Sequence, residues 1–216
     1  MIGLILTHGQ SLITMGAIAN RSGNGDPNLA ELAYRKMTEI GLTSFLSVEA
    51  PIQEDRSIYS HMQLIVDQRE INAAGPLLGL LSAHRKFPLD DIFVLACNMP
   101  FMKTSCLYYL FDLWLERISE IYVYQKGGRA TPYCGIYSYN ALRQIDRLVT
   151  ASNKRENSLQ YYVQHLNTCY MHIPKEEELA FQTITSQSQL RILYETGLSA
   201  ANKLAWSKQS SIFLNN

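Results

Sequence analysis

Three short segments of the chain combine glycine, proline and polar residues in a way that suits phosphate binding. They read LTHGQSLITMG (residues 6–16), GPLLGLL (75–81) and LACNMPF (95–101). In the first, glycines let the backbone approach a phosphate, and unpaired N–H groups form a concave anion site. Asp67, upstream of the second, offers a carboxylate that can accept paired hydrogen bonds. These residue types are suited to binding a phosphorylated ligand.

The elements that must position these segments follow from the hydrophobic pattern, in which apolar runs alternate with amphipathic stretches. Strands are expected over residues 2–6, 44–48, 61–66, 92–97, 121–124, 135–139, 169–173 and 181–184. Helices are expected over 28–40, 75–84, 105–120, 141–149, 159–166 and 186–194. The alternation predicts an α/β fold, a single three-layer α/β/α domain around a mostly parallel, Rossmann-like sheet. We assign residues 1–196 to this domain and 197–216 to a C-terminal tail or extra helix.

In a sheet of this kind the ligand normally lies outside the carboxyl ends of the strands. Residues 7–16, 67–79 and 98–101 each follow a predicted strand, so all three should meet at that edge. The sequence therefore predicts one ligand site built from segments that are far apart along the chain.

The order of these motifs gives a family resemblance. Residues 6–16 resemble the pattern LAGGxSxRMG, 75–81 resemble GPLxGI, and 95–101 resemble LACDMPF. Two later segments continue the series: GRATPYCGIY (128–137) is similar to GRxxPLxGLY, and FQTIT (181–185) lies where FxNINTP is expected. Over roughly residues 1–190 the chain resembles the molybdenum cofactor guanylyltransferases, which implies a fold of the nucleotide-diphospho-sugar transferase type.

That family moves GMP from GTP to molybdopterin, releases pyrophosphate and uses Mg²⁺. The resemblance implies a catalytic and metal-binding position at Asn98, where the family has an aspartate. It also implies two groups of binding residues: Leu6, Thr7, His8, Gly9, Asp67 and Gly75 for the nucleotide, and Arg129, Pro132 and Tyr137 on the side of the molybdopterin cofactor.

Several positions depart from the family pattern. His8 replaces a glycine, residues 12–14 stand where an arginine is expected, residues 17–20 contain no lysine, and Thr183 replaces an asparagine. Guanylyl transfer needs positive charge around the phosphates, and Mg²⁺ prefers carboxylate to amide oxygens. Three hypotheses stay open: an active guanylyltransferase, a non-catalytic nucleotide- or cofactor-binding homologue, and a related transferase for another nucleotide, such as a cytidylyl or sugar-phosphate enzyme.

Structural roles also compete with functional ones at single residues. His8 could contact phosphate or fill space in its loop. Asp67 could bind nucleotide or cap a turn before Gln68. Asn98 could bind a metal weakly or hold its loop through an Asx turn.

The composition restricts the classes of binding partner that we expect for this chain. Apolar residues make up 47% of the chain, and 19 basic residues balance 19 acidic ones, which indicates a globular protein without a broad charged surface. We therefore expect no binding to nucleic acid or membrane. No apolar run is long enough to cross a bilayer, and residues 1–6 lack the features of a signal peptide, so we expect a cytoplasmic protein. Tyr108, Tyr109 and Trp114 could form a homodimer face or contact another protein.

The four cysteines, at 97, 106, 134 and 169, form no CxxC pair, and we expect free thiols that pack as small apolar groups. His165, Cys169 and His172 have a spacing that matches no zinc pattern, and packing explains them better.

Overall fold

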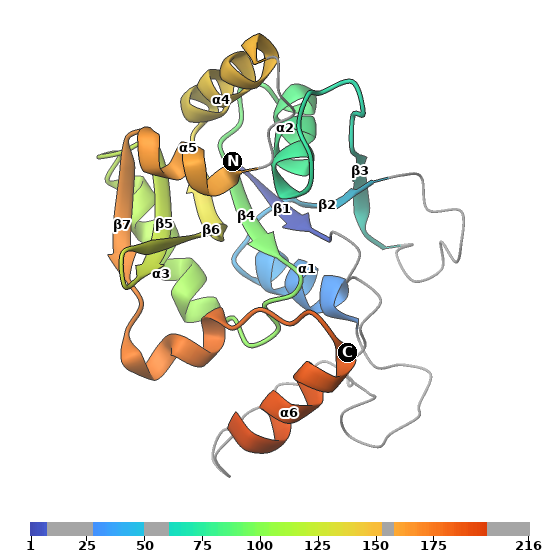
Figure 1. Ribbon diagram of the computed structural model, residues 1–216, viewed down its shortest axis with the longest axis vertical. Coiled ribbons are helices and arrows are strands. Elements are labelled where there is room, and N and C mark those ends of the chain that lie inside the picture. The colour runs from blue at the N-terminus through green and yellow to red at the C-terminus, as the bar shows by residue number, and fades with distance from the viewer. Residues whose placement is uncertain (8–27, 50–60, 153–157, 198–216) are drawn as a thin grey trace.

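A computed structural model describes residues 1–7, 28–49, 61–152 and 158–197, and its centre is a seven-stranded sheet (Figure 1). The strand order is β3-β2-β1-β4-β6-β5-β7. Within it β6 runs antiparallel to its neighbours β4 and β5, while the other pairings are parallel. The strands are β1 (Ile2–Leu6), β2 (Ser44–Val48), β3 (Gln63–Val66), β4 (Ile92–Ala96), β5 (Ile121–Lys126), β6 (Arg129–Tyr137) and β7 (Thr168–His172).

Helices cover both faces of this sheet, which confirms the predicted three-layer α/β/α architecture. Alternate residues of β1 show the division. Ile5 packs in a core with helices α1 and α3, whereas Leu4 and Leu6 pack in a second core with α2, α4 and α5. The helices are α1 (Leu29–Glu39), α2 (Pro76–Lys86), α3 (Thr104–Leu115), α4 (Tyr139–Ala151), α5 (Leu159–His165) and α6 (Gln187–Gly197), with a 3₁₀ helix η3 (Lys175–Phe181).

Local signals explain where several helices begin and end. Side-chain oxygens of Asn28, Ser138 and Ser158 accept hydrogen bonds from backbone N–H groups in the first turns of α1, α4 and α5, as N-cap residues do. Gly41 follows α1 with a φ of 85°, a conformation that favours glycine at a helix end. None of the helices in the described ranges is long and apolar enough to span a membrane.

Several predictions of secondary structure were wrong. The helix expected over 105–120 ends at Leu115, and the strand expected over 135–139 begins at Arg129. Residues 181–184 form no strand. They leave η3 as an extended connection in which the N–H of Ile184 donates to the carbonyl of Asn98 at 2.8 Å. Their apolar residues are buried against the loop that contains Asn98. The hydrophobic pattern alone does not distinguish a segment buried in this way from a strand. Tyr139 begins α4 and does not end β6, because Ser138 caps the helix at this point.

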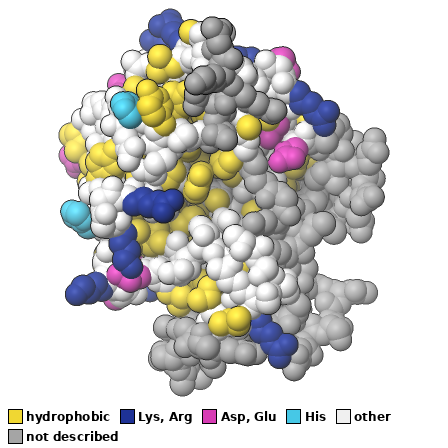
Figure 2. All heavy atoms as spheres, viewed as in Figure 1, with side chains coloured by type: hydrophobic (Ala, Val, Ile, Leu, Met, Phe, Trp, Pro, Cys, Tyr) yellow, Lys and Arg dark blue, Asp and Glu magenta, His cyan; other side chains and the backbone are white. Residues whose placement is uncertain are grey.

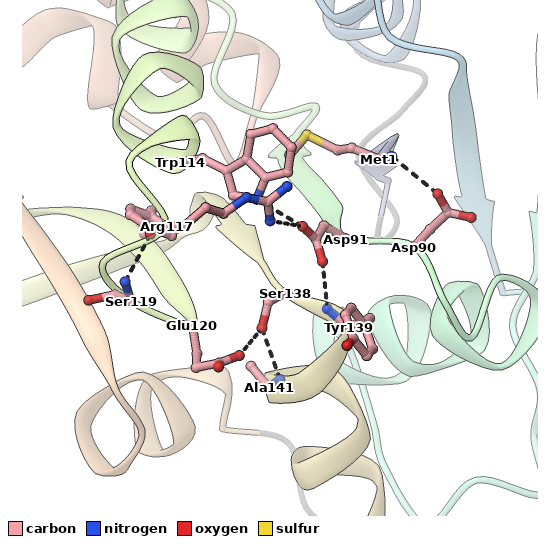
Figure 3. A network of polar contacts seen from close by, with 11 residues as sticks. Met1, Asp90, Asp91, Trp114, Arg117, Ser119, Glu120, Ser138, Tyr139 and Ala141 are labelled. Atoms are coloured by element: carbon pink, nitrogen blue, oxygen red, sulfur yellow. Dashed lines mark hydrogen bonds and ion pairs between the residues drawn. The ribbon is translucent and has the colours of Figure 1, made fainter.

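A buried carboxylate ties three elements together at the amino end of β4 (Figure 3). Asp91 Oδ2 accepts hydrogen bonds from Trp114 Nε1 at 2.9 Å and Arg117 at 2.8 Å, and Oδ1 accepts from the N–H of Tyr139 at 2.8 Å. The interaction joins β4 to the end of α3 and the start of α4. Trp114 is thus held in a half-buried position, whereas Tyr108 and Tyr109 are exposed on α3.

Replacing Asp91 with alanine should lower the free energy of unfolding by about 2–3 kcal/mol, since it leaves the Trp114 and Tyr139 N–H donors without partners. Urea denaturation measures the change. Asp90→Ala is the matched control: Asp90 pairs with the N-terminal amine at 3.1 Å and its side chain is 40% exposed, so its loss should cost less than about 1 kcal/mol. Equal losses in the two variants would contradict this assignment.

Candidate functional site

The first and third motifs meet where β1 and β4 end. Leu6 pairs with Ala96 across the two strands, and the N–H of Cys97 donates to the carbonyl of Leu6 at 3.0 Å. The Cys97 thiol lies 3.5 Å from the carbonyl of Thr7. Burial raises the pKa of that thiol to about 12, so Cys97 remains protonated and acts as a packing group. Thr7 and Asn98 therefore leave the sheet side by side, as the topology predicts.

Hydrogen bonds from two hydroxyl groups link the ends of the next two strands to this point. Thr7 Oγ1 donates to the carbonyl of Ser47 at 2.6 Å, and Ser47 Oγ donates to Asp67 Oδ1 at 2.7 Å. The N–H of Asp67 donates to the carbonyl of Val48 at 2.8 Å. Asp67 is buried, at 4% exposure, so its carboxylate is fixed at the carboxyl edge of the sheet. Ser47 carries no local sequence signal for this role.

Helix α2 closes on these strand ends through two glycines. A Cβ on Gly79 would lie 2.3 Å from Ser47 Oγ and 3.1 Å from a methyl group of Leu6, so this position has no room for a side chain. Gly75 stands at the N-cap of α2 with a φ of 58°, a conformation that L-residues rarely adopt. The second motif therefore brings the start of α2 against Leu6, Ser47 and Asp67.

Asn98 has a buried polar atom whose hydrogen-bonding capacity the fold does not satisfy. Its Oδ1 is buried and has no hydrogen-bond partner among the described residues, which argues against the Asx turn considered above. Its backbone carbonyl accepts from the N–H of Ile184. The fifth motif therefore lies against the third. An amide oxygen can ligate a hard cation, although it brings no charge.

Lys36 of α1 contacts the same loop, a contact that no sequence pattern predicted. Its Nζ donates to the carbonyl of Pro100 at 2.7 Å. Burial lowers the pKa of Lys36 to about 8, an effect that nearby Glu39 partly opposes. The loop after β4 is thus held by a hydrogen bond from a desolvated amine.

A cavity of about 370 Å³ lies beside this loop, between the turn joining β5 and β6 and the fifth motif. Among its lining residues are Arg129 and Pro132, both predicted, together with Lys126, Gln182 and Thr183. Lys126 pairs with Glu178 at 2.6 Å, whereas Arg129 forms no ion pair within the described residues. Figure 2 shows basic and acidic side chains next to hydrophobic surface on the left of the molecule, the side where β5 and β7 lie in Figure 1.

The structure does not bring every predicted residue to this region. Tyr137 pairs with Ile92, at the opposite end of β4 from Asn98, because β6 runs antiparallel. It is fully buried, and its hydroxyl donates to the carbonyl of Pro132 at 2.7 Å. His8 and Gly9 lie outside the described residues. Over the described part of the chain, no three His, Cys, Asp or Glu side chains are grouped as a metal site, and all four cysteines are free.

Comparison with known proteins decides the family. Residues 22–167 match the model of the MobA-like NTP transferase domain. The chain belongs to this family. It is 25% identical over 206 residues to a probable molybdenum cofactor guanylyltransferase of Geobacillus sp. (strain WCH70), a match that covers 88% of this chain and 95% of that protein.

Solved structures agree on the fold. A molybdopterin-guanine dinucleotide biosynthesis protein A from Archaeoglobus fulgidus superposes with a TM-score of 0.65 at 16% identity, over 88% of this chain and 95% of the other. A cytidylyltransferase from Leptospira borgpetersenii gives 0.64 at 17% identity, over 100% and 97%. Both are nucleotidyltransferase-type α/β folds, as the motif series of this MobA-like chain implied.

The lowered pKa of Lys36 predicts a pH dependence of stability. Between pH 8 and about 10.5 the unfolded chain keeps a proton that the folded chain releases, so Lys36 makes stability rise with pH, by at most about 1.4 kcal/mol per pH unit. Below pH 8 the Lys36 amine is charged in the folded state, and the full cost of burying that charge lowers the free energy of unfolding. The unfolding free energies of wild type and Lys36→Met are measured from urea curves at pH 7, 8, 9 and 10. The value for wild type minus the value for Lys36→Met should increase with pH.

Lys175→Met is the control, because Lys175 is exposed at the start of η3. Its curve against pH should run parallel to that of wild type. A constant difference between wild type and Lys36→Met from pH 7 to 10 would show that the Lys36 amine is not desolvated in solution.

Proposed function

We propose that this chain transfers GMP from GTP to molybdopterin and releases pyrophosphate. The observation that carries the proposal is the meeting of three motifs of the series at one edge of the sheet: Thr7 and Asn98 leave adjacent strands, and Ile184 donates to Asn98. Membership of the MobA-like family and the match to the Geobacillus protein support the same activity.

The nucleotide half of the site would lie over the ends of β1, β2 and β3. The segment Thr7–Gly9 would surround the phosphates with backbone N–H groups, and Leu6 would form the base of that segment. Asp67 is held rigidly by Ser47 and would accept hydrogen bonds from the guanine edge or the ribose. Gly75 would let the start of α2 approach the nucleotide closely.

The acceptor half would occupy the cavity beside Asn98. Arg129 has a guanidinium with no ion-pair partner in the described part of the chain, and such a group suits the terminal phosphate of a pterin acceptor. Pro132 and Tyr133 supply apolar surface for the ring system. Tyr137 would contribute indirectly, through its hydrogen bond to Pro132.

In the reaction, an oxygen of the acceptor phosphate attacks the α-phosphorus of GTP. The new P–O bond forms as the bond to the bridging oxygen of the β-phosphate breaks, and pyrophosphate leaves with that electron pair. Arg129 would orient the attacking phosphate, and the Thr7–Gly9 segment would hold the leaving group in line. Asn98 Oδ1, which has no hydrogen-bond partner among the described residues, would help to hold a Mg²⁺ ion, and the ion would supply positive charge that neutralises the charge developing on the phosphates.

A second candidate is a nucleotide-binding homologue without turnover. It is favoured by the neutral side chain at Asn98 and by the engagement of nearby lysines: Lys103 pairs with Glu177 at 2.7 Å and Lys126 pairs with Glu178. Such a protein would bind GTP or another nucleotide but release no pyrophosphate.

Thermal melting with GTP, CTP and ATP, each with and without Mg²⁺, tests the nucleotide binding that both candidates require, and a pyrophosphate-release assay then separates them. A ligand present at 100 times its dissociation constant stabilises the fold by about 2.7 kcal/mol. We expect stabilisation by GTP with Mg²⁺, followed by pyrophosphate release when molybdopterin is added. GTP binding without release would favour the second candidate. Release with CTP alone would assign another nucleotide, and no binding at all would refute both.

Asn98→Asp should tighten Mg²⁺-dependent GTP binding by about tenfold or more, because it restores an anionic ligand to a partly buried position, where one charge is worth more than about 1.4 kcal/mol. Titration calorimetry measures the change. Gln63→Glu, at the exposed start of β3, adds the same charge at the amino edge of the sheet and should leave the affinity unchanged. An equal response of both variants, or none of Asn98→Asp, would remove Asn98 from the metal position.

A further inference from the structure

A second hollow lies at the opposite edge of the sheet from Asn98. It has a volume of about 500 Å³ and runs between α4, the end of α5 and the segments that lead into β5 and β7. Its lining residues are Glu120, Asn140, Ala141, Arg143, Gln144, Arg147, His165, Leu166 and Asn167. In Figure 1, α4 and α5 lie near the beginning of β4, whereas the arrowhead of β4 points away from them. We call this hollow the α4–α5 groove.

The groove carries an excess of positive charge. Arg143 and Arg147 stand one helical turn apart on α4, so their side chains are neighbours on one face. Neither forms an ion pair within the described residues, and Arg143 donates only to the neutral amide of Asn140, at 3.3 Å. The acidic residue of the same helix, Asp146, is already paired with Arg85 at 2.9 Å. Two guanidinium groups therefore line one hollow in which Glu120 is the one acidic side chain among the described lining residues, so the groove keeps an excess of positive charge.

The one carboxylate of the groove is occupied by the fold (Figure 3). Glu120 accepts the hydroxyl hydrogen of Ser138, and Ser138 Oγ in turn caps α4 by accepting from the N–H of Ala141 at 3.1 Å. The N–H of Tyr139 is likewise bound to Asp91. Because these first-turn amides are engaged, the charge available to a ligand comes from the arginine side chains and not from the helix end.

His165, at the end of α5, lines the opposite side of the groove from the arginines, and one of its ring nitrogens is already hydrogen-bonded. Its Nδ1 lies 2.7 Å from the carbonyl of Tyr161, which can only accept, so Nδ1 carries the hydrogen. The imidazole also stacks on the Tyr161 ring, with centroids 4.1 Å apart. This arrangement fixes the ring and leaves Nε2 to a ligand.

The remaining lining favours a small hydrophilic molecule over a peptide. Ala141 and Leu166 are its apolar residues, so the groove offers no pocket for a large hydrophobic anchor. Asn140, Gln144 and Asn167 supply amide groups that can bind hydroxyls or phosphate oxygens. Its volume falls within the range of about 300–1,000 Å³ that is usual for small-molecule sites.

We infer that the α4–α5 groove binds a phosphorylated small molecule, whose phosphate is held between Arg143 and Arg147. Paired guanidinium forks are suited to phosphate oxygens because each can donate two parallel hydrogen bonds. The site is separate from the proposed nucleotide site and does not depend on the proposed transfer reaction.

The test uses the whole chain, with pyrophosphate and ribose 5-phosphate as probes at constant ionic strength. Backbone amide signals from ¹H–¹⁵N spectra should shift for residues 140–147 and 165–167 during each titration. These shifts should persist when GTP and Mg²⁺ are also present. The double variant Arg143→Gln/Arg147→Gln should weaken binding, measured from those signals, at least tenfold. Arg143→Lys/Arg147→Lys keeps the charge but loses the forks, and should weaken binding less.

Lys175→Gln, which removes one exposed charge elsewhere, should leave the affinity of the groove unchanged. The inference is overturned if the signals of residues 140–147 do not respond to either probe, or if Lys175→Gln weakens binding as much as the arginine variants. Loss of GTP binding elsewhere in the molecule would not affect the result, so failure of the proposed function remains distinguishable.

Discussion

The structure depends on the direct pairing of β1 with β4. These two strands are buried along their length, and their backbones are hydrogen-bonded up to the contact between Cys97 and Leu6. Since both strands run in the same direction and end together, the segments that follow them emerge at one place. No side chain has to be strained to bring Thr7 close to Asn98. Hydrophobic burial in the sheet therefore does the positioning, and the polar residues only have to follow the right strands.

The antiparallel β6 adds a second consequence. It returns the chain from the carboxyl edge to the amino edge, so that its two ends serve different regions. Arg129, at its start, lines the cavity beside the Asn98 loop, while Ser138, just beyond its end, caps α4 near Asp91. One strand thus connects the acceptor side of the proposed site with the base of the α4–α5 groove. The fold therefore has two cavities lined by basic side chains, one at each edge of a single sheet.

Sequence reasoning succeeded where a pattern reports burial and failed where long-range contacts decide. The strands over residues 2–6 and 44–48 were predicted at their observed ends, because short, mainly apolar segments that end in polar residues are typical of buried strands. The assignment at 181–184 failed, because Ile184 is buried against the Asn98 loop without joining the sheet. Lys36 escaped notice since its partner, Pro100, lies 64 residues away. The position of Tyr137 depends on the direction of β6, which no linear motif encodes.

The departures from the family pattern are unevenly distributed over the proposed site. Most of the residues that differ, among them His8 and Asn98, belong to the half that would bind nucleotide phosphates and metal, whereas Thr183 lines the acceptor cavity. The acceptor half keeps Arg129 without an ion-pair partner in the described residues, and Glu178 pairs with Lys126 rather than with this guanidinium. Electrostatic stabilisation of a transferring phosphate needs charge at the α-phosphate and leaving group, whereas binding of an acceptor phosphate needs only a nearby cation. The two abilities can therefore be lost separately. A chain of this design can retain its hold on an acceptor even where transfer is slow, so acceptor binding and turnover have to be measured as independent properties.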